Sequence, residues 1–486
     1  MNRLAELYRP SLALWTDLGQ LTMAFGYFKT GVAGRDASFS LFFRQHPFGG
    51  GFTVACGLAV FIDYLEQFRF ELEDLDYLST LRGNDAQPLF DDHFLDYLRQ
   101  LRLECEVHAA AEGTVVFPHE PLVRVSGPLL QAQLLGAALH CIIDHPSRVA
   151  TKAARICQAA RGGTVLDLGL GRTSGIDGGL AASRAAYVGG VDATSNVLAG
   201  RLHGIPVQGT PAHSWIMAFD DEEEAFVAYA SALPGNCVFL VEPCDTLEGV
   251  RRATRVGQQL HRRGYERIGV LLDSSDLGPL SAEARRILDA AGLDQASIVA
   301  TGDLDEWSIE NLRQQGARVD VWGVGSELAA AHDEPAVGGV YELSAIREPG
   351  GSWQPRVTRS QQAATVVHPG VHQVRRYRGR DGFVADAIYD AVAPLGRGCT
   401  IVDPLDATRR WDLSDELSFE DLLVPVFSQG RRVYDVPTLA DARKRLKDQL
   451  AGFGEQITRL HDPQHYRVGV ERSLHEIEMH LLEASS

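Results

Sequence analysis

The stretch Arg267-Ile-Gly-Val-Leu-Leu-Asp273 shows how the central part of this chain is built. Its consecutive apolar residues are typical of a short buried strand, and the run ends at the acidic Asp273. A helical pattern follows at Ala282–Ala291, and the next apolar run is Ala296–Thr301. A strand, a helix and a second strand in this order predict parallel pairing of the two strands.

The same alternation extends from about residue 150 to about residue 345. The apolar runs are Thr164–Gly169, Ala186–Val191, Ile205–Gly209, Cys237–Glu242, Arg267–Asp273, Ala296–Thr301, Arg318–Trp322 and Gly339–Leu343. Seven or eight such units in roughly 190 residues predict a compact, irregular (β/α) barrel. We therefore expect an α/β protein in three parts: an N-terminal α/β domain over 1–150, the barrel carrying the active site over 151–345, and a C-terminal extension over 346–486.

The first 150 residues mix both periodicities. Helical spacing of apolar residues predicts helices at Asp17–Phe28, Leu58–Phe68 and Asp92–Leu103, and alternation predicts a strand at Ala37–Arg44. Near the other end of the chain, Thr438–Leu450 has the pattern of a helix.

Composition and charge exclude several classes of function. The 486 residues carry a net charge of −18, which repels a polyanion and disfavours nucleic-acid binding. No apolar stretch approaches the roughly 18 residues of a membrane helix, and we recognise no signal peptide. Seven cysteines without a CxxC pair argue against a disulfide framework or a zinc site, so we expect a reducing cytoplasm. The four lysines are Lys29, Lys152, Lys444 and Lys447, so no barrel strand can supply a Schiff-base lysine.

Function in parallel α/β barrels gathers where the strands end. Asp273 and Asp276 follow one predicted strand, and from their types they could hold ribose hydroxyls or Mg²⁺. Asp276 could equally cap the next helix. Glu242 ends another run. His213, in Gly209-Thr-Pro-Ala-His-Ser-Trp215, follows a third run, where it could act as a base, an acid or a phosphoryl acceptor, although a lone histidine is more often structural.

A glycine-rich turn follows the run Arg318–Trp322. Gly323-Val-Gly-Ser326 lies between this run and a helical segment that starts at Glu327. Gly323 and Gly325 would let backbone N–H groups approach a phosphate, and Ser326 could add a donor. A plain tight turn between a strand and a helix would have the same sequence.

Taken together, the sequence resembles the nicotinate phosphoribosyltransferase family from Trp15 to about Leu482. The resemblance rests on ordered segments that include Thr16–Met23, Phe43–Gly51, Gly175–Ser183, Thr194–Val207, Gly209–Ser214, Leu272–Leu277, Asp303–Glu306, Gly323–Ser326 and Gly338–Tyr341. It implies an irregular α/β barrel with an N-terminal α/β domain and a C-terminal extension packed on that domain. It also implies a homodimer with active sites shared between the subunits.

The resemblance further implies a reaction. Members of the family join nicotinate to 5-phosphoribosyl-1-pyrophosphate (PRPP), giving nicotinate mononucleotide and pyrophosphate, with Mg²⁺ and with ATP hydrolysis coupled through a phosphohistidine in NAD biosynthesis. His213 matches that histidine, and Gly323, Gly325 and Ser326 match the cradle of the 5′-phosphate. Asp273 and Asp276 match acidic residues near the ribose and base, and they are the candidate metal ligands.

Three positions depart from the family pattern on the side of the acceptor. Gly19 replaces a tyrosine that stacks on the pyridine ring from the neighbouring subunit, and Gly171 replaces an arginine that contacts the substrate. Leu271 replaces a further arginine. Leu170 and Arg172 flank Gly171, and Arg172 can partly substitute for the lost cation. The acceptor pocket should therefore be larger and less positive than in the family.

Three hypotheses follow from this pattern. The chain is a nicotinate phosphoribosyltransferase with a rebuilt acceptor pocket, or a diverged paralogue that transfers phosphoribosyl to another acceptor. The third hypothesis is a homologue that binds a nucleotide without catalysis. His213, Asp273 and Asp276 argue against the third hypothesis, because the reacting groups are retained.

Overall fold

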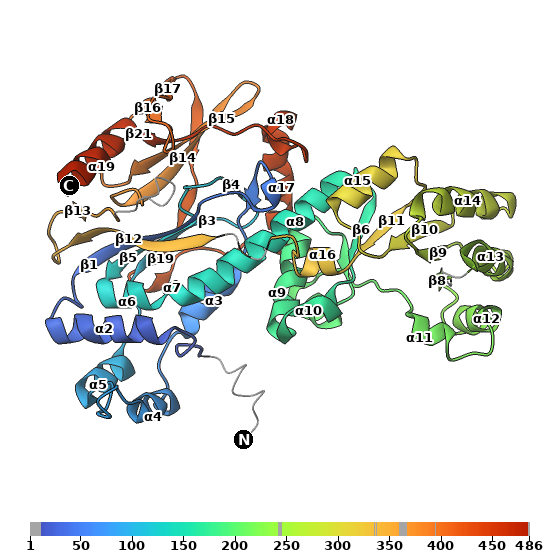
Figure 1. Ribbon diagram of the computed structural model, residues 1–486, viewed down its shortest axis with the longest axis horizontal. Coiled ribbons are helices and arrows are strands. Elements are labelled where there is room, and N and C mark those ends of the chain that lie inside the picture. The colour runs from blue at the N-terminus through green and yellow to red at the C-terminus, as the bar shows by residue number, and fades with distance from the viewer. Residues whose placement is uncertain are drawn as a thin grey trace. The chain divides into compact units, whose positions relative to one another are not determined.

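The protein is described here from a computed structural model, which covers residues 11–241, 245–334, 336, 338–358, 367–393 and 395–484. The chain divides into two compact units (Figure 1). Unit 1 comprises Met1–Arg148 and Ala336–Ser486, and unit 2 comprises Val149–Pro335. Within the covered ranges, no helix has both the length and the apolar character needed to cross a membrane.

Unit 2 is built around one six-stranded sheet, and all five of its ladders are parallel. The strands are β6 (Thr164–Asp167), β7 (Ala193–Thr194), β8 (Cys237–Leu240), β9 (Ile268–Asp273), β10 (Ser297–Thr301) and β11 (Val321–Val324). Their order in the sheet is β7-β6-β11-β10-β9-β8. This is the cyclic order of a barrel with one open seam, because β7 and β8 are not paired in the described part of the chain.

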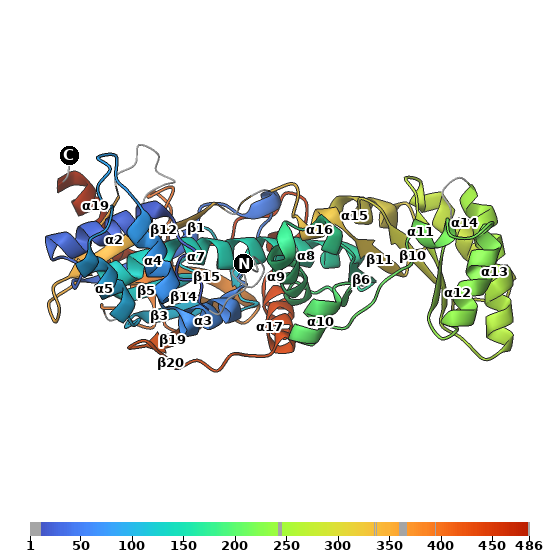
Figure 2. The ribbon, with the colours of Figure 1, turned by 90° about the horizontal axis from the view of Figure 1, so that it is seen from below.

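Helices follow almost every strand of unit 2. They are α8 (His145–Ala160, which crosses the unit boundary), the 3₁₀ turn η3 (Leu170–Arg172), α9 (Gly175–Val188), α10 (Val197–His203), α11 (His213–Ile216), α12 (Glu222–Ala232), α13 (Thr246–Arg262), α14 (Leu277–Ala290), α15 (Glu306–Gln314) and α16 (Ser326–Ala329). α12, α13 and α14 pack side by side as a layer outside the strands (Figure 2).

A buried ion-pair cluster joins α8 to α15. The carboxylate of Glu306 lies 2.6 Å from Lys152 Nζ and accepts a hydrogen bond of 2.7 Å from Arg155 Nε. The guanidinium of Arg155 also lies over the ring of Trp307. All three charged side chains have 1% exposure or less, so removing one of them would leave a buried charge without compensation.

Three sequence predictions for the barrel are wrong. Ala186–Val191 is the end of α9 and a glycine turn rather than a strand, because a buried alanine-rich helix has the same apolar run. Ile205–Gly209 forms only an isolated bridge between Val207 and Thr194. Gly339–Leu343 is a strand, but it belongs to unit 1. The predicted barrel is therefore an open six-stranded sheet in the described residues, and the α/β class itself is confirmed.

Unit 1 contains a seven-stranded antiparallel sheet and a six-stranded sheet. The first has the order β13 (Gln354–Pro355), β12 (Gly339–Arg347), β1 (Asp36–Phe43), β5 (Val123–Pro128), β3 (Glu106–Ala110), β19 (Leu423–Ser428) and β20 (Arg431–Arg432). The second has the order β17 (Arg410–Leu413), β16 (Cys399–Val402), β21 (Val468–Glu471), β15 (Gly382–Asp390), β14 (His372–Gly379) and β18 (Ser418–Asp421). β2 (Thr53–Val54) and β4 (Val115–Val116) form a separate pair.

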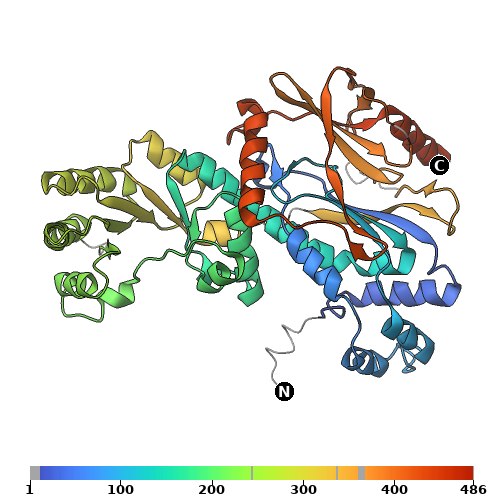
Figure 3. The same cartoon turned by 180° about the vertical axis from the view of Figure 1, so that it is seen from behind.

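The helices of unit 1 include the predicted ones, with shifts of a few residues at their ends. They are α2 (Leu18–Thr30), the 3₁₀ turn η1 (Pro47–Gly49), α3 (Leu58–Gln67), α4 (Leu72–Thr80), α5 (Asp92–Gln100), α6 (Leu129–Leu134), α7 (Gly136–Leu139), the π-helical turn η2 (His140–Asp144), α17 (Leu439–Gly452), α18 (Glu455–Thr458) and α19 (Arg472–Ala484). α19 packs on β16 and β21 of the six-stranded sheet (Figure 3).

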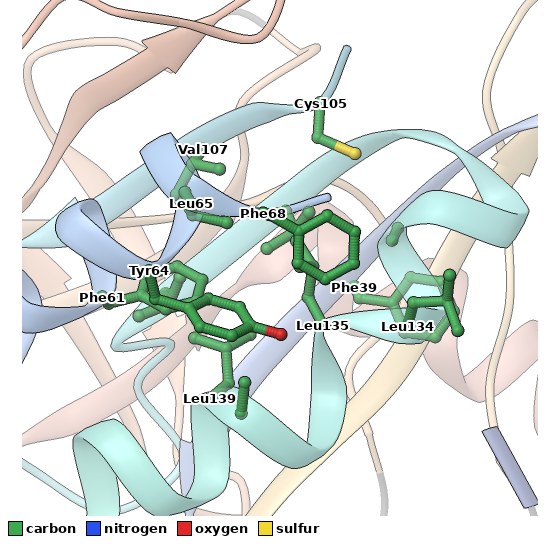
Figure 4. Packing of buried hydrophobic residues seen from close by; sticks show 14 of the residues in the cluster. Phe39, Phe61, Tyr64, Leu65, Phe68, Cys105, Val107, Leu134, Leu135 and Leu139 are labelled. Atoms are coloured by element: carbon green, nitrogen blue, oxygen red, sulfur yellow. The ribbon is translucent and has the colours of Figure 1, made fainter. Parts of the chain in front are cut away.

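The main core of unit 1 forms where α3 meets the helices after β5. Phe61, Tyr64, Leu65 and Phe68 recur at helical spacing, so they share one face, and all four are buried. They belong to one apolar cluster with residues such as Leu135 (Figure 4). Burial raises the pKa of the Tyr64 phenol well above its usual range.

Candidate active site

The polar side chains that follow the strands of unit 2 meet at one edge of its sheet. Because every ladder is parallel, the carboxyl ends of all six strands lie at the same edge. His213 Nε2 lies 3.7 Å from Asp273 Oδ2, and their side chains are 41% and 43% exposed. The sequence placed both residues at this edge, and the structure brings their reactive atoms together.

Asp273 owes its position to the strand that precedes it. Ile268–Leu272 are buried on both faces of the sheet, and Asp273 is the first residue of β9 that reaches solvent. It pairs in register with Thr301 of β10, and Gly302, the next residue, lies beside its carboxylate. Leu271 and Asp273 are two residues apart on a strand, so their side chains point to the same face of the sheet.

His213 lies in the connection between β7 and β8, at the first position of α11. Trp215, two residues later, anchors this segment because its indole N–H donates a 3.1 Å hydrogen bond to the carbonyl of Ala225 in α12. Its ring also contacts Phe219 and Tyr229, with centroids 5.1 and 5.6 Å away. A partly buried aromatic anchor thus holds His213 beside Asp273. The sequence singled out His213 but assigned Trp215 no role.

Asp276 occupies the N-cap position of α14, yet its side chain makes no capping hydrogen bond. The neighbouring loops differ, because Asp245 caps α13 and Asp305 caps α15 through their carboxylates. Asp276 is exposed, and its own backbone N–H donates to Ser274 Oγ. Its carboxylate therefore remains available for a ligand. Glu242, the other predicted acidic residue of this edge, lies outside the described residues.

The predicted turn Gly323–Ser326 begins inside the sheet, because Gly323 and Val324 are the last two residues of β11, and only Gly325 separates that strand from α16. A Cβ on Gly323 would lie 2.6 Å from Leu168 Cδ1 and 2.7 Å from Thr301 Cγ2, so only glycine fits there. A Cβ on Gly325 would meet nothing within 4 Å, and Ser326 begins α16 directly after it. The backbone of this turn is therefore open to approach by a ligand.

The segment predicted to line the acceptor pocket lies next to this turn. Leu170, Gly171 and Arg172 form η3, with Leu170 43% exposed and open space around Gly171. Gly169, just before them, packs so closely on the next loop that a Cβ would lie 2.7 Å from the carbonyl oxygen of Gly325. The structure thus brings Leu170–Arg172 and Gly325–Ser326 together.

The remaining acceptor-side positions lie elsewhere. Leu271 is 2% exposed and packs in an apolar cluster with Leu240 and Val299. Gly19 lies in unit 1, where it is exposed in the first turn of α2 with open space around it. Neither position offers a cation or an aromatic ring.

Comparison with solved structures defines the class of protein first. Human nicotinic acid phosphoribosyltransferase superposes with a TM-score of 0.80 and 33% identity, covering 96% of this chain and 99% of that chain. The nicotinate-nucleotide pyrophosphorylase from Pyrococcus furiosus has the same fold, with a TM-score of 0.68 at 20% identity and coverage of 91% and 95%. The fold is thus a mixed α/β phosphoribosyltransferase fold with a curled, parallel half-barrel sheet.

Sequence comparison then gives the family. Residues 14–144 match the nicotinate phosphoribosyltransferase (NAPRTase) N-terminal domain, and residues 372–478 match the nicotinate phosphoribosyltransferase C-terminal domain. Nicotinate phosphoribosyltransferase of Bacillus subtilis is 37% identical over 463 residues, covering 94% of this chain and 92% of the relative. The chain belongs to the nicotinate phosphoribosyltransferase family.

Proposed function

We propose that this protein transfers the phosphoribosyl group of PRPP to nicotinate, giving nicotinate mononucleotide and pyrophosphate. One observation carries the proposal: the similarity to curated nicotinate phosphoribosyltransferases spans more than nine-tenths of both chains. The protein is thus a phosphoribosyltransferase that acts on small molecules in NAD biosynthesis. The pair His213–Asp273 at the open edge of the sheet supports the same conclusion.

The residues at this edge suit the donor side of the reaction. Departure of pyrophosphate leaves positive charge at C1 of the ribose, and carboxylates such as Asp273 and Asp276 stabilise that charge. The backbone that follows β11, at Gly325 and Ser326, supplies N–H donors that fix the 5′-phosphate, with Gly323 as the strand residue that precedes them. Fixing the phosphate and the ribose holds C1 in line with the nitrogen of the acceptor.

His213 accepts the γ-phosphoryl group of ATP in this mechanism. Asp273 Oδ2 lies 3.7 Å from Nε2, close enough to stabilise positive charge on the imidazole as it takes up the phosphoryl group. A ring nitrogen of His213 attacks the γ-phosphorus, forming an N–P bond as the P–O bond to ADP breaks. Hydrolysis of the phosphohistidine returns His213 and releases phosphate.

The donor set at this edge fits a magnesium ion that is held largely by its substrate. The described residues contain no group of three or more metal-binding side chains, but Mg²⁺ is commonly held by one or two carboxylates together with substrate phosphates. Asp273 and Asp276 would supply those carboxylates. When bound, the ion neutralises charge on the leaving pyrophosphate.

We extend the proposal to assembly and compartment. Family resemblance supports a homodimer with active sites shared between subunits, in which Gly19 would lie at the active site of the neighbouring subunit. The six cysteines in the described residues are all free, which suits a cytoplasmic location.

A second candidate function is transfer to an acceptor other than nicotinate. Leu271 favours it, because this side chain is buried in an apolar cluster and cannot hold a carboxylate. The open space around Gly19 and Gly171 would also admit a larger acceptor. If the protein does bind nicotinate, Arg172 is the cation of η3 that would hold its carboxylate.

A pyrophosphate-release assay separates these functions. The protein is incubated with PRPP, Mg²⁺ and ATP, and with nicotinate, nicotinamide or a bulkier aromatic acid as acceptor. Turnover with nicotinate at ordinary rates supports the proposed function, and turnover only with another acceptor supports the second candidate. Donor binding without release for any acceptor would overturn both.

A further inference from the structure

Asp167, the last residue of β6, carries a carboxylate that is almost completely buried at 2% exposure. Both of its oxygens are hydrogen-bonded. The backbone N–H of Gly169 donates to Oδ1 at 2.9 Å, and the hydroxyl of Thr194 donates to Oδ2 at 2.7 Å. Burying a carboxylate is costly unless such bonds are made, so these two contacts are strongly constrained.

The network continues from Thr194 into two helices. Thr194 Oγ1 accepts a 3.0 Å hydrogen bond from the backbone N–H of Asn196. The amide of Asn196 donates to the carbonyl of Gly179 and to Ser183 Oγ in α9, and its oxygen caps α10 by accepting from the N–H of Ala199. Thr194, Asn196 and Ser183 are each at most 3% exposed.

Asp167 fixes the short segment that leads into η3. Its bond to Gly169 fixes the turn immediately before Leu170–Arg172. The same segment also contacts the end of β11 and the residue after it. The N–H of Leu168 donates a hydrogen bond to the carbonyl of Val324, and Gly169 packs against Gly325. One buried carboxylate therefore sets the position of η3 relative to the glycine turn after β11.

We infer that Asp167 is a positioning residue of the transfer reaction, which holds η3 and the Gly325 turn at the separation that the bound substrates require. It acts through these two segments, because its carboxylate is almost completely buried and cannot contact a bound substrate. The inference rests on the proposed function, since it assigns η3 to the acceptor and the turn to the donor phosphate. Small displacements of these segments should weaken binding of both substrates, because a misplaced binding group loses its hydrogen bonds to the ligand.

The test uses paired variants of the full-length protein. Asp167→Ala removes both hydrogen bonds, and Asp167→Asn keeps an oxygen for the N–H of Gly169. Thr194→Val removes the donor to Asp167 at nearly constant volume, and Thr194→Ser restores the hydroxyl. If Asp167→Ala fails to fold, the Thr194 pair carries the test. Asp320→Ala is the matched control, because Asp320 also accepts a backbone N–H, that of Ile298, but precedes β11 at the opposite edge.

Three measurements are made on each variant: the rate of trypsin cleavage after the exposed Arg172, the dissociation constant for PRPP by calorimetry, and KM and kcat for nicotinate. For Asp167→Ala and Thr194→Val we expect about tenfold faster cleavage, and about tenfold increases in the PRPP dissociation constant and in KM, with kcat within about threefold of the parent. Thr194→Ser and Asp320→Ala should stay within about twofold of the parent, and Asp167→Asn should lie between.

A lower melting temperature with unchanged cleavage, PRPP binding and KM would show that the network only stabilises the fold, and would overturn the inference. If the parent does not turn over nicotinate, the proposed function fails. Cleavage and PRPP binding still decide whether Asp167 positions the two segments.

Discussion

Units 1 and 2 each contain a six-stranded sheet, and the two sheets place polar residues very differently. The sheet of unit 2 is fully parallel, so its strands end at one edge, where His213 and Asp273 lie exposed. The sheet of unit 1 is mostly antiparallel, and its charges lie within the strands. Arg376 of β14 and Asp386 of β15 pair there at 2.6 Å with no exposed surface.

The difference shows how strand direction decides what a polar side chain can do. Parallel strands bring their carboxyl ends together and leave side chains there open to a ligand. In the six-stranded sheet of unit 1, the guanidinium of Arg376 is enclosed by the rings of Phe117, Phe383 and Phe453. Such a charge can contribute to stability and specificity of folding, but it cannot meet a substrate.

The largest effect should come from the exposed histidine of unit 2. His213→Ala removes the proposed phosphoryl acceptor, so we expect ATP hydrolysis to fall by about a thousandfold or more while some nicotinate transfer remains. Hydrolysis is measured by ADP release, with and without PRPP. His261→Ala, an exposed histidine of α13, is the control and should behave as the parent. If the parent itself hydrolyses no ATP, the phosphohistidine role of His213 is wrong.

Breaking the buried pair of unit 1 should instead change stability. Arg376→Met leaves the carboxylate of Asp386 buried without its cation, which should lower the free energy of unfolding by about 3–5 kcal/mol. Lys444→Met breaks the exposed pair with Asp448 and should leave the free energy of unfolding as in the parent, because solvent screens that pair. Both values come from chemical denaturation followed by circular dichroism. Equal losses for the two variants would contradict the assignment of Arg376 to a structural role.

Unit 1 should also lose stability in mild acid. Burial lowers the pKa of His372 to about 3 and that of His119 to about 4, whereas an unfolded histidine titrates near pH 6.5. Between about pH 6.5 and 4 these histidines are protonated in the unfolded chain but remain neutral in the folded protein. The free energy of unfolding therefore falls as pH falls, by about 1.4 kcal/mol per pH unit for each histidine. Melting temperature against pH measures this.

The variant His372→Gln should reduce the slope of that dependence, because it removes one of the three histidines in the described part of unit 1, with His108 and His119, whose pKa is lowered by burial. His465→Gln removes an exposed histidine and should leave the slope as in the parent. An unchanged slope in His372→Gln would mean that His372 does not resist protonation in the folded protein.

The smallest effect should come from restoring a cation at the open edge of unit 2. Gly171→Arg meets no steric obstacle and adds a guanidinium to η3, so KM for nicotinate should fall about tenfold. Gly235→Arg adds the same charge just before β8, at the opposite edge of the sheet, and should leave KM unchanged. A lower KM for a neutral acceptor instead would favour the second candidate function.

The sequence predicted which residues lie at the carboxyl edge of the unit 2 sheet better than it predicted the strands of that sheet. Alternation of strands and helices brings Asp273 to that edge, because Asp273 ends the parallel strand β9. His213 reaches the same edge through the connection between β7 and β8, since the run predicted before it forms only an isolated bridge. The strand at Gly339–Leu343 was predicted, but its partner was not. It pairs as β12 with β1 of unit 1, and an apolar run carries no information about which strand it pairs with. Ala186–Val191 failed because periodicity cannot separate a buried helix from a buried strand.

The network around Asp167 lay beyond sequence reasoning for a related reason. Asp167 and Thr194 are 27 residues apart, and nothing in either segment indicates that the other is its partner. Asn196 offered a local signal, because it precedes a helical segment as an N-cap residue does. Local patterns find caps and strand ends, but tertiary hydrogen bonds require the fold.

The open seam between β7 and β8 affects which changes in loop length the fold can accept during evolution. In a closed barrel, a longer or shorter connection between adjacent strands must still keep those strands in register. Here the connection from Gln208 to Asn236 joins two strands that share no ladder in the described part of the chain, so its length can change without disturbing any pairing. His213 lies on this connection, so the loop that carries the proposed phosphoryl acceptor can be remodelled without changing the sheet.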